Sequence, residues 1–358
     1  MKTVCVSTYC DWDNYGSMLQ TLGMKNCLKS MGYESFAVKD SPAPALTYKT
    51  SMRLSKNPKA CFMGVYRYLV RKKVAKKYSN TIKFMNENID MKYYDNYDVL
   101  KNNPPKADLY VAGSDQIWRF RVCRPVFFLD FIDEGQKRIA YAASMGITDI
   151  PEKNKELFKD LVNKFDYISV REGDNKEAIS QYTDKDISVN IDPALLCDKE
   201  EWRKYQKPYE MKKPYVLVYA IYWDSKLNKK LKELHKKTGL DIVCIGGKGF
   251  ENIYANKRIF DASPEEFLYL VDNAQAVVTS SFHGTVFSII FNKKLCAVIN
   301  PASPSRIEYL LSLLKVKNST VENLLDTDIG FYDETREIIK RETQKSKDYL
   351  RKAFGENE

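Results

Sequence analysis

This sequence of 358 residues lacks the features that mark membrane-spanning and exported proteins. No apolar run approaches the roughly 20 residues that a membrane-spanning helix needs. The N-terminal residues already have the pattern of a short strand, whose apolar part is too brief for a signal peptide, and no cleavage site follows. Residence in the cytoplasm is therefore expected.

The sequence also lacks the common signatures of metal and nucleotide cofactor sites. Its eight cysteines form no CxxC pair, and several lie in strand-like apolar runs, which is typical of small buried side chains rather than zinc ligands or disulfides. The loop after the first predicted strand has no GxGxxG turn, which argues against a nicotinamide cofactor. We expect neither a metal nor a resident cofactor.

Acidic residues are absent from one strongly basic segment. Between Arg53 and Lys77 there are nine Lys or Arg, interleaved with aromatic and aliphatic side chains, and the formal charge of the whole chain is +10. Such a segment is typical of a helix that lies on an anionic membrane or of a solvated helix packed on the protein, and both interpretations stay open. No nucleic-acid-binding motif is present, so nucleic acid is not an expected partner.

Strands and helices alternate twice along the chain, which predicts an α/β protein with two doubly wound, Rossmann-like domains facing a cleft. We place the first domain at 1–200 and the second at 201–325, with the break in the charged, proline-containing stretch 200–214. The charged residues 326–358 have spaced apolar positions and are expected to form one helix packed across the body.

The most informative stretch is 276–300, a strand-turn-helix-strand unit whose polar residues lie at the turn around His283. Ligands of open α/β sheets bind beyond the carboxyl ends of the strands, where a helix N-terminus offers N–H groups to an anion. His283 is one of only two histidines. The alternative is that His283 merely caps the helix beside Ser281.

Polar residues follow other predicted strands in the same way. Arg171 comes directly after a buried strand and can bind a carboxylate or phosphate, or else form a structural ion pair with Glu172 or Asp192. Two further loops can contact a ligand or simply cap the next helix; they contain Asp13, Asn14, Tyr15 and Gly16 in one, and Ser114, Asp115 and Gln116 in the other.

Four short motifs, taken together and in order, resemble the polysaccharide pyruvyl transferase family. They are GSDQIW at 113–118, SVRE at 169–172, DPALL at 192–196 and SFHGT at 281–285, and the match extends from Asn14 to Ile307. The resemblance implies a fold like that of the GT-B glycosyltransferases. It also implies transfer of pyruvate from phosphoenolpyruvate to two hydroxyls of a sugar in a cell-surface glycan, such as an exopolysaccharide, or in its lipid-linked precursor, with a cyclic ketal and phosphate as products.

The same resemblance assigns roles to individual residues. It implies that His283 is catalytic and that Arg171 binds the donor. Some members have Arg-Leu-His where this chain has Ser281-Phe282-His283, so we hypothesise that Arg306 supplies the missing charge. The expected phosphoenolpyruvate site comprises Arg171, Ser281, Phe282, Gly284, Thr285 and Arg306, and the expected acceptor site comprises Asp13, Asn14, Tyr15, Gly16, Ser114 and Gln116.

The proposed chemistry needs cations for a carboxylate and a phosphate, and a group that moves protons near neutral pH. His283 can protonate the donor or the departing phosphate, and Asp115 or Asp13 can act as the base. Two alternatives remain: a nucleotide-sugar glycosyltransferase of the GT-B type, with Glu308 on the ribose, or a glycan- or lipid-binding protein without catalysis.

Overall fold

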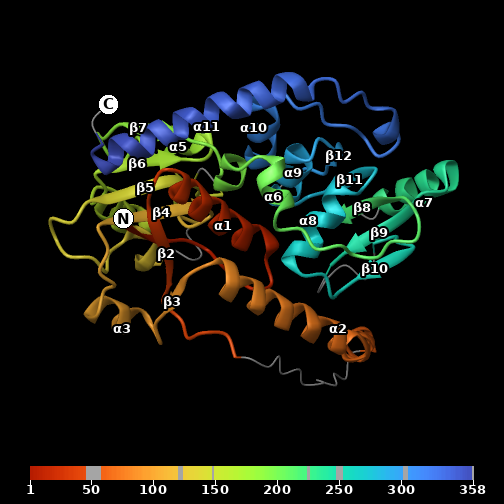
Figure 1. The fold of residues 1–358 in the computed structure, drawn as a ribbon, viewed down its shortest axis with the longest axis horizontal. Coiled ribbons are helices and arrows are strands. Elements are labelled where there is room, and N and C mark those ends of the chain that lie inside the picture. The colour runs from red at the N-terminus through yellow and green to blue at the C-terminus, as the bar shows by residue number, and fades with distance from the viewer. Residues whose placement is uncertain are drawn as a thin grey trace.

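The computed structural model describes residues 1–45, 58–119, 124–146, 149–223, 226–246, 253–300 and 305–356. These residues form two parallel sheets flanked by helices, one sheet from each half of the chain (Figure 1). The glycine-rich stretch 246–249 has the composition of a plain turn, and all of it except Gly246 lies outside the described residues.

In the described part of the chain, the first sheet has seven strands in the order β3-β2-β1-β4-β5-β6-β7, all parallel. The order reverses between β1 and β4, which creates a switch point at their carboxyl ends. The strands are β1 (Thr3–Ser7), β2 (Glu34–Lys39), β3 (Met91–Tyr93), β4 (Leu109–Asp115), β5 (Arg138–Ala143), β6 (Tyr167–Val170) and β7 (Ile187–Val189).

The second sheet has five described strands in the order β10-β9-β8-β11-β12, also parallel, with its switch point between β8 and β11. Its strands are short apolar runs that fit burial on both faces. They are β8 (Tyr215–Tyr219), β9 (Asp241–Ile245), β10 (Lys257–Ile259), β11 (Ala276–Thr279) and β12 (Lys294–Ala297).

The helices begin and end at residues suited to their caps. The Ser263 side chain and Glu266 form a capping box at one start, and Gly355, with φ 76°, ends the last helix. The helices are α1 (Tyr15–Ser30), α2 (Pro58–Asn88), α3 (Tyr97–Asn102), α4 (Lys155–Val162), α5 (Gly173–Ile179), α6 (Lys199–Arg203), α7 (Lys226–Thr238), α8 (Pro264–Asp272), α9 (Phe282–Ile290), α10 (Ser305–Leu313) and α11 (Tyr332–Phe354), with 3₁₀ turns η2 (Pro125–Phe128), η3 (Glu152–Asn154), η4 (Pro193–Leu196) and η5 (Leu324–Asp326).

Three boundaries differ from those expected. The apolar pattern predicts a strand over 188–196, whereas β7 ends at Val189. The Asp192 side chain accepts from Ala194 N and starts the turn η4 at Pro193, which has no N–H for a sheet. The apolar run 108–112 predicts a strand that ends at Ala112, whereas β4 continues through Asp115, which pairs with Ala143 of β5.

The third difference concerns the helix that carries His283. The apolar pattern predicts a helix from Val286, whereas α9 begins at Phe282, one turn earlier. The Ser281 hydroxyl accepts from the Gly284 N–H at 3.3 Å and so fixes the earlier start. His283 is therefore the second residue of the helix rather than part of the preceding turn.

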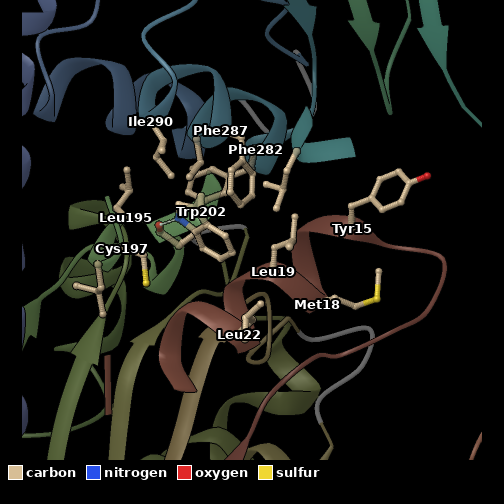
Figure 2. Close-up of a cluster of buried hydrophobic side chains, with 14 of the residues drawn as sticks. Tyr15, Met18, Leu19, Leu22, Leu195, Cys197, Trp202, Phe282, Phe287 and Ile290 are labelled. Carbon is tan, nitrogen blue, oxygen red and sulfur yellow. Dashed lines mark hydrogen bonds between the residues drawn. The ribbon is translucent and has the colours of Figure 1, made fainter. Parts of the chain in front are cut away.

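The two halves meet through a continuous apolar cluster. Figure 2 shows Leu19 and Leu22 of α1, Trp202 of α6 and Phe287 of α9 pointing toward one another, and all four side chains are buried. Trp202 also donates from Nε1 to the Ala194 carbonyl at 3.0 Å. Every residue of α9 is buried, so this helix belongs to the core of the whole molecule.

Two long helices connect distant parts of the chain. In Figure 1, α11 returns along the top of the view to the first sheet, where the Tyr349 hydroxyl donates to the Ala140 carbonyl of β5 at 2.8 Å. At the lower edge lies α2, whose Lys76 pairs with Asp261 near α8 at 3.4 Å. Of the basic segment 53–77, residues 53–57 lie outside the described residues.

Candidate active site

The candidate site, where His283 of the second half approaches Asp192 of the first, lies near the switch points of the two sheets. At the first, the Thr8 hydroxyl donates to the Ser114 carbonyl at 2.9 Å and so joins the ends of β1 and β4. At the second, the Thr279 hydroxyl donates to the Tyr219 carbonyl, joining the ends of β11 and β8. The segments that follow these strands supply the charged residues described next.

His283 projects from the first turn of α9 toward the first half of the molecule. Its side chain is buried, and its Nε2 lies 3.4 Å from Oδ2 of Asp192. That contact lacks hydrogen-bond alignment, so Nε2 is a buried polar atom without a hydrogen bond among the described residues. The imidazole is thus held with its buried Nε2 facing a carboxylate.

Asp192 is the point at which several donors meet. Its Oδ2 accepts from Nη1 of Arg171 at 2.7 Å and from the Ser114 hydroxyl at 3.2 Å, while Oδ1 accepts from the Ala194 N–H at 3.0 Å. Burial opposes ionisation, but the neighbouring His283, the charge of Arg171 and the hydrogen bond from the Ala194 N–H hold the pKa of Asp192 well below its usual range. Asp192 is therefore a buried carboxylate that stays ionised.

Arg171 is buried in an ion-pair cluster. Its Nε donates to Oε1 of Glu172 at 2.8 Å, and Nη2 lies 3.9 Å from Oδ1 of Asp115. The structural pairing that the sequence left open is thus present with both neighbours, Glu172 and Asp192. Nη2 nevertheless has no hydrogen-bond partner among the described residues, so one edge of the guanidinium remains available.

Arg306, in the first turn of α10, converges on the same place. Its guanidinium carbon lies 5.9 Å from the centre of the Phe282 ring, and that of Arg171 lies 4.0 Å from it. With the Gln116 amide oriented so that its oxygen faces Arg306, that oxygen accepts from Nε and Nη1 at 3.2 Å each. No described carboxylate lies within ion-pair distance of Arg306.

The surroundings of Arg306 are electrostatically unfavourable for a cation. Burial and the nearby positive charge of Arg171 lower its pKa, and the carboxylates of Asp115 and Glu172 only partly offset them. A pocket between the two arginines is lined by Glu172, Asp192 and Phe282 as well. An anion bound there would relieve the repulsion between the two guanidiniums.

Asp115 ends β4 with a backbone φ of 70°, in the left-handed region that non-glycine residues seldom adopt. Its Oδ1 accepts from the N–H of Gln116 at 2.8 Å. The residue faces the Arg171 cluster and is only partly buried. Backbone strain of this kind is found more often at functional sites than elsewhere.

The N-terminal loop reaches His283 from the first half. A β-carbon on Gly16 would collide with Nδ1, Cγ and Cβ of His283, the last at 2.6 Å, so only glycine fits there. Tyr15 is buried, and its hydroxyl donates to the Ala262 carbonyl at 2.7 Å. Asn14 caps α1 by accepting from Ser17 N at 3.3 Å, and Asp13 is exposed.

The remaining residues expected around the donor have structural partners. Ser281 caps α9, Thr285 donates from its hydroxyl to the Ser281 carbonyl at 3.1 Å, and Gly284 leaves room for the Thr279 hydroxyl. Phe282 presents its ring to both guanidiniums. The residue that comes close to Gly284 is therefore Thr279 at the end of β11.

The structure adds two carboxylates that sequence reasoning left without a role in the site, Asp192 and Glu172. Glu172 is fully buried, and its Oε2 has no partner among the described residues. Glu172 follows one predicted strand and Asp192 lies in the stretch predicted as the next, which was the available signal, but an Asp-Pro pair and an Arg-Glu pair also occur as ordinary caps and ion pairs. Glu308, the residue considered for ribose binding, is exposed on α10.

The described residues contain no group of three or more His, Cys, Asp or Glu side chains placed to hold a metal ion. Six cysteines, at positions 5, 10, 27, 197, 244 and 296, are buried free thiols. No helix in the described ranges is both long and apolar enough to cross a bilayer.

Comparisons with known proteins give a family and a fold. The family model for polysaccharide pyruvyl transferase matches residues 14–301. The comparison with curated proteins gave no match.

Three solved structures share the fold at low sequence identity. UDP-GlcNAc 2-epimerase from Neisseria meningitidis, bound to UDP-GlcNAc, is 13% identical, with 100% of both chains covered and a TM-score of 0.52. A putative UDP-N-acetylglucosamine 2-epimerase from Listeria monocytogenes is 12% identical, with 96% of this chain and 91% of that chain covered and a TM-score of 0.53. S. aureus MnaA in a structure with UDP is 11% identical, with 94% of this chain and 91% of that chain covered and a TM-score of 0.55. The predicted GT-B-like fold is confirmed.

Proposed function

The chain belongs to the polysaccharide pyruvyl transferase family, and on that premise we propose that it transfers pyruvate from phosphoenolpyruvate to two hydroxyls of a sugar. The acceptor is a sugar or oligosaccharide of a cell-surface glycan, or its lipid-linked precursor. The product is a cyclic ketal, and inorganic phosphate is released.

One observation carries the proposal: two guanidiniums and an imidazole from both halves converge with unused donors. Nη2 of Arg171 and Nε2 of His283 are buried without hydrogen bonds, and Arg306 has no described carboxylate within ion-pair distance. Phosphoenolpyruvate carries a carboxylate and a phosphate, and guanidinium forks suit both groups. The first turn of α9 adds N–H groups close to His283.

The reaction adds the two O–H groups of the acceptor to one carbon of the donor. A proton is delivered to the methylene carbon, which becomes the methyl group, and one sugar oxygen bonds to the adjacent cationic carbon. The second sugar oxygen then displaces phosphate from that carbon. Two protons leave the acceptor hydroxyls. One of them restores the acid that protonated the methylene carbon, and the other leaves with phosphate or solvent.

We assign the proton delivery to His283, because it is buried beside an ionised carboxylate with Nε2 free. Asp115, only partly buried at the end of β4, is placed as the base that takes a proton from the acceptor. Asp13 is the exposed residue of the N-terminal loop and is assigned to the acceptor side with Ser114 and Gln116. Tyr15 and Gly16 act there through packing.

We further propose that α2 brings the protein to an anionic membrane surface. Leu69 is 71% exposed and Tyr68 is 44% exposed, although both are apolar or aromatic. Lys72 and Lys73 are exposed one turn further along the helix. Apolar side chains flanked by lysines suit the headgroup region of a bilayer, which would place the site near a lipid-linked acceptor.

The test of the transferase is acceptor-dependent release of phosphate from phosphoenolpyruvate by the full-length protein with lipid-linked or nitrophenyl sugars. His283→Ala and Arg171→Ala are each expected to lower release by at least about 100-fold. His235→Gln is the matched control, because the His235 ring bonds to the Leu240 carbonyl and to Asn256, and it should leave release unchanged. Circular dichroism checks that each variant is folded.

Full activity in His283→Ala would contradict the assignment of the acid. Consumption of nucleotide sugars, with no phosphate released from phosphoenolpyruvate by any acceptor, would replace the proposal by a glycosyltransferase.

A further inference from the structure

The carboxylate nearest to His283 comes from the other half of the molecule. Asp192 lies between β7 and η4 in the first half, and its Oδ2 is 3.4 Å from Nε2 of His283 in α9 of the second. The Asp192 side chain is fully buried, and that of His283 is 7% exposed. At such burial a charge on either residue is poorly screened by water and acts strongly on the other.

We propose that Asp192 is a positioning residue that holds His283 in place and favours its protonated form. The catalytic consequence rests on the proposed function, because it makes His283 a competent acid in pyruvyl transfer. The physical claim is independent of that function: an ionised carboxylate of one half sets the charge of an imidazole in the other.

The geometry explains why Asp192 attracts the imidazole without tying up its proton. Oδ2 already accepts two better-aligned hydrogen bonds, from Arg171 at 2.7 Å and from Ser114 at 3.2 Å. The third contact, to His283, is longer and lacks alignment. Asp192 therefore stabilises the imidazolium mainly by charge, and the Nε2 proton remains available to a substrate.

Other charged groups lie in the same region as the Asp192–His283 pair. Arg171, Glu172 and Arg306 line the pocket that includes Asp192, and Asp115 lies 3.9 Å from Arg171. Asp13 is exposed on the N-terminal loop. Arg171 is compensated by Glu172, Asp192 and Asp115. Among the described side chains, only the Asp192 carboxylate lies within 4 Å of the imidazole, so its charge has the largest effect.

The chain contains only two histidines, which makes a direct test practical. We would label the full-length protein with ¹³C-histidine and follow the two ring signals by NMR as pH is varied, without any substrate. His235→Gln assigns the signals. In the wild-type sample the second histidine, His235, serves as an internal reference. Its ring bonds to the Leu240 carbonyl and to Asn256.

In Asp192→Asn, the midpoint of the His283 titration is expected to move down by about one pH unit or more, while that of His235 stays. The amide keeps the size of the side chain and can still accept from Ala194. An unchanged His283 midpoint in the folded variant would overturn the proposal.

Ser114→Ala provides a second test if Asp192→Asn does not fold. It removes one competing hydrogen bond from Oδ2 without changing any charge, so the carboxylate interacts more strongly with His283 and the midpoint is expected to rise. A midpoint that stays or falls would contradict the proposal.

Kinetics separate this inference from the proposed function. If phosphate is released, Asp192→Asn should lower kcat by about 100-fold and move the pH profile in the same direction as the NMR midpoint. If no phosphate is released by the wild-type protein, the proposed function fails, and the NMR result still decides the Asp192–His283 relationship.

Discussion

The imidazole ring of His283 lies against the α-carbon of Gly16, although the two residues belong to different halves of the molecule. A methyl group at position 16 would displace the ring, because the colliding atoms include Cβ of His283 at 2.6 Å and both residues are held in the first turns of helices. Gly16→Ala should therefore lower phosphate release by about 100-fold.

The control for Gly16→Ala is Gly330→Ala, whose new methyl would meet only the Asp328 side chain at 3.3 Å. It should retain wild-type release. Equal activity of Gly16→Ala and wild type would mean that His283 does not have to stay where the structure places it.

Arg306 is expected to bind the donor through charge and through its planar fork. Arg306→Ala should raise KM for phosphoenolpyruvate by about 10-fold to 100-fold, as expected for the loss of a charged hydrogen bond worth about 1.5–3 kcal/mol. Arg306→Lys should recover part of the affinity, because it keeps the charge but loses the fork. Steady-state kinetics at varied donor concentration measure both.

Arg203→Ala is a suitable control for Arg306→Ala, because Arg203 is an exposed arginine paired with Asp272 at 2.8 Å away from the site. Wild-type donor affinity in Arg306→Ala would refute the idea that Arg306 compensates for the absence of an arginine at Ser281.

The contact of α2 with a membrane can be measured by co-sedimentation with vesicles. The triple variant Leu69→Gln, Lys72→Gln, Lys73→Gln should lose binding to vesicles containing phosphatidylglycerol, since each lysine near an anionic surface contributes about 1 kcal/mol. Pure phosphatidylcholine vesicles should bind little of either protein.

The matched control changes the same residue types on η3 and α4, with Leu157→Gln, Lys153→Gln and Lys159→Gln. Leu157 is 50% exposed, so the control removes a comparable apolar side chain. If both triple variants bind like the wild type, α2 is an ordinary solvated helix.

The apolar cluster between the halves should be sensitive to a single truncation. Phe287 is fully buried, and its ring centre lies 5.1 Å from that of Trp202. Phe287→Ala should lower the free energy of unfolding by about 3–5 kcal/mol, measured by urea denaturation. Ile329→Ala, at a 40% exposed position, should change it by no more than about 0.5 kcal/mol.

The order of strands and helices could be predicted from the sequence because apolar runs of about five residues alternate with longer helical patterns. The capping box at Ser263 and Glu266 was likewise readable and is present. Boundaries set by single side chains were less accessible. The start of α9 at Phe282 depends on one hydrogen bond to Ser281, which an apolar pattern does not encode.

For the site, the sequence brought out residues that follow strands. The structure places Arg171 and Arg306 on one pocket, with Asp115 3.9 Å from Arg171 and His283 3.4 Å from Asp192 of the pocket lining. The sequence could not show that Arg171 donates to Glu172 and Asp192 while its Nη2 has no hydrogen-bond partner among the described residues, because Asp192 is distant in the chain. The contact of Gly16 with His283 was hidden for the same reason.

The path of α11 has a consequence for biosynthesis. Its final turns complete the first half of the molecule: Tyr349 bonds to β5, Lys137 donates to the Ala353 carbonyl at 3.0 Å, and Phe354 packs on Tyr33 with ring centres 4.9 Å apart. These residues are synthesised long after the strands that they cover. The N-terminal sheet therefore cannot reach its final packing until α11 has emerged from the ribosome, and the nascent chain must be kept from aggregating until then.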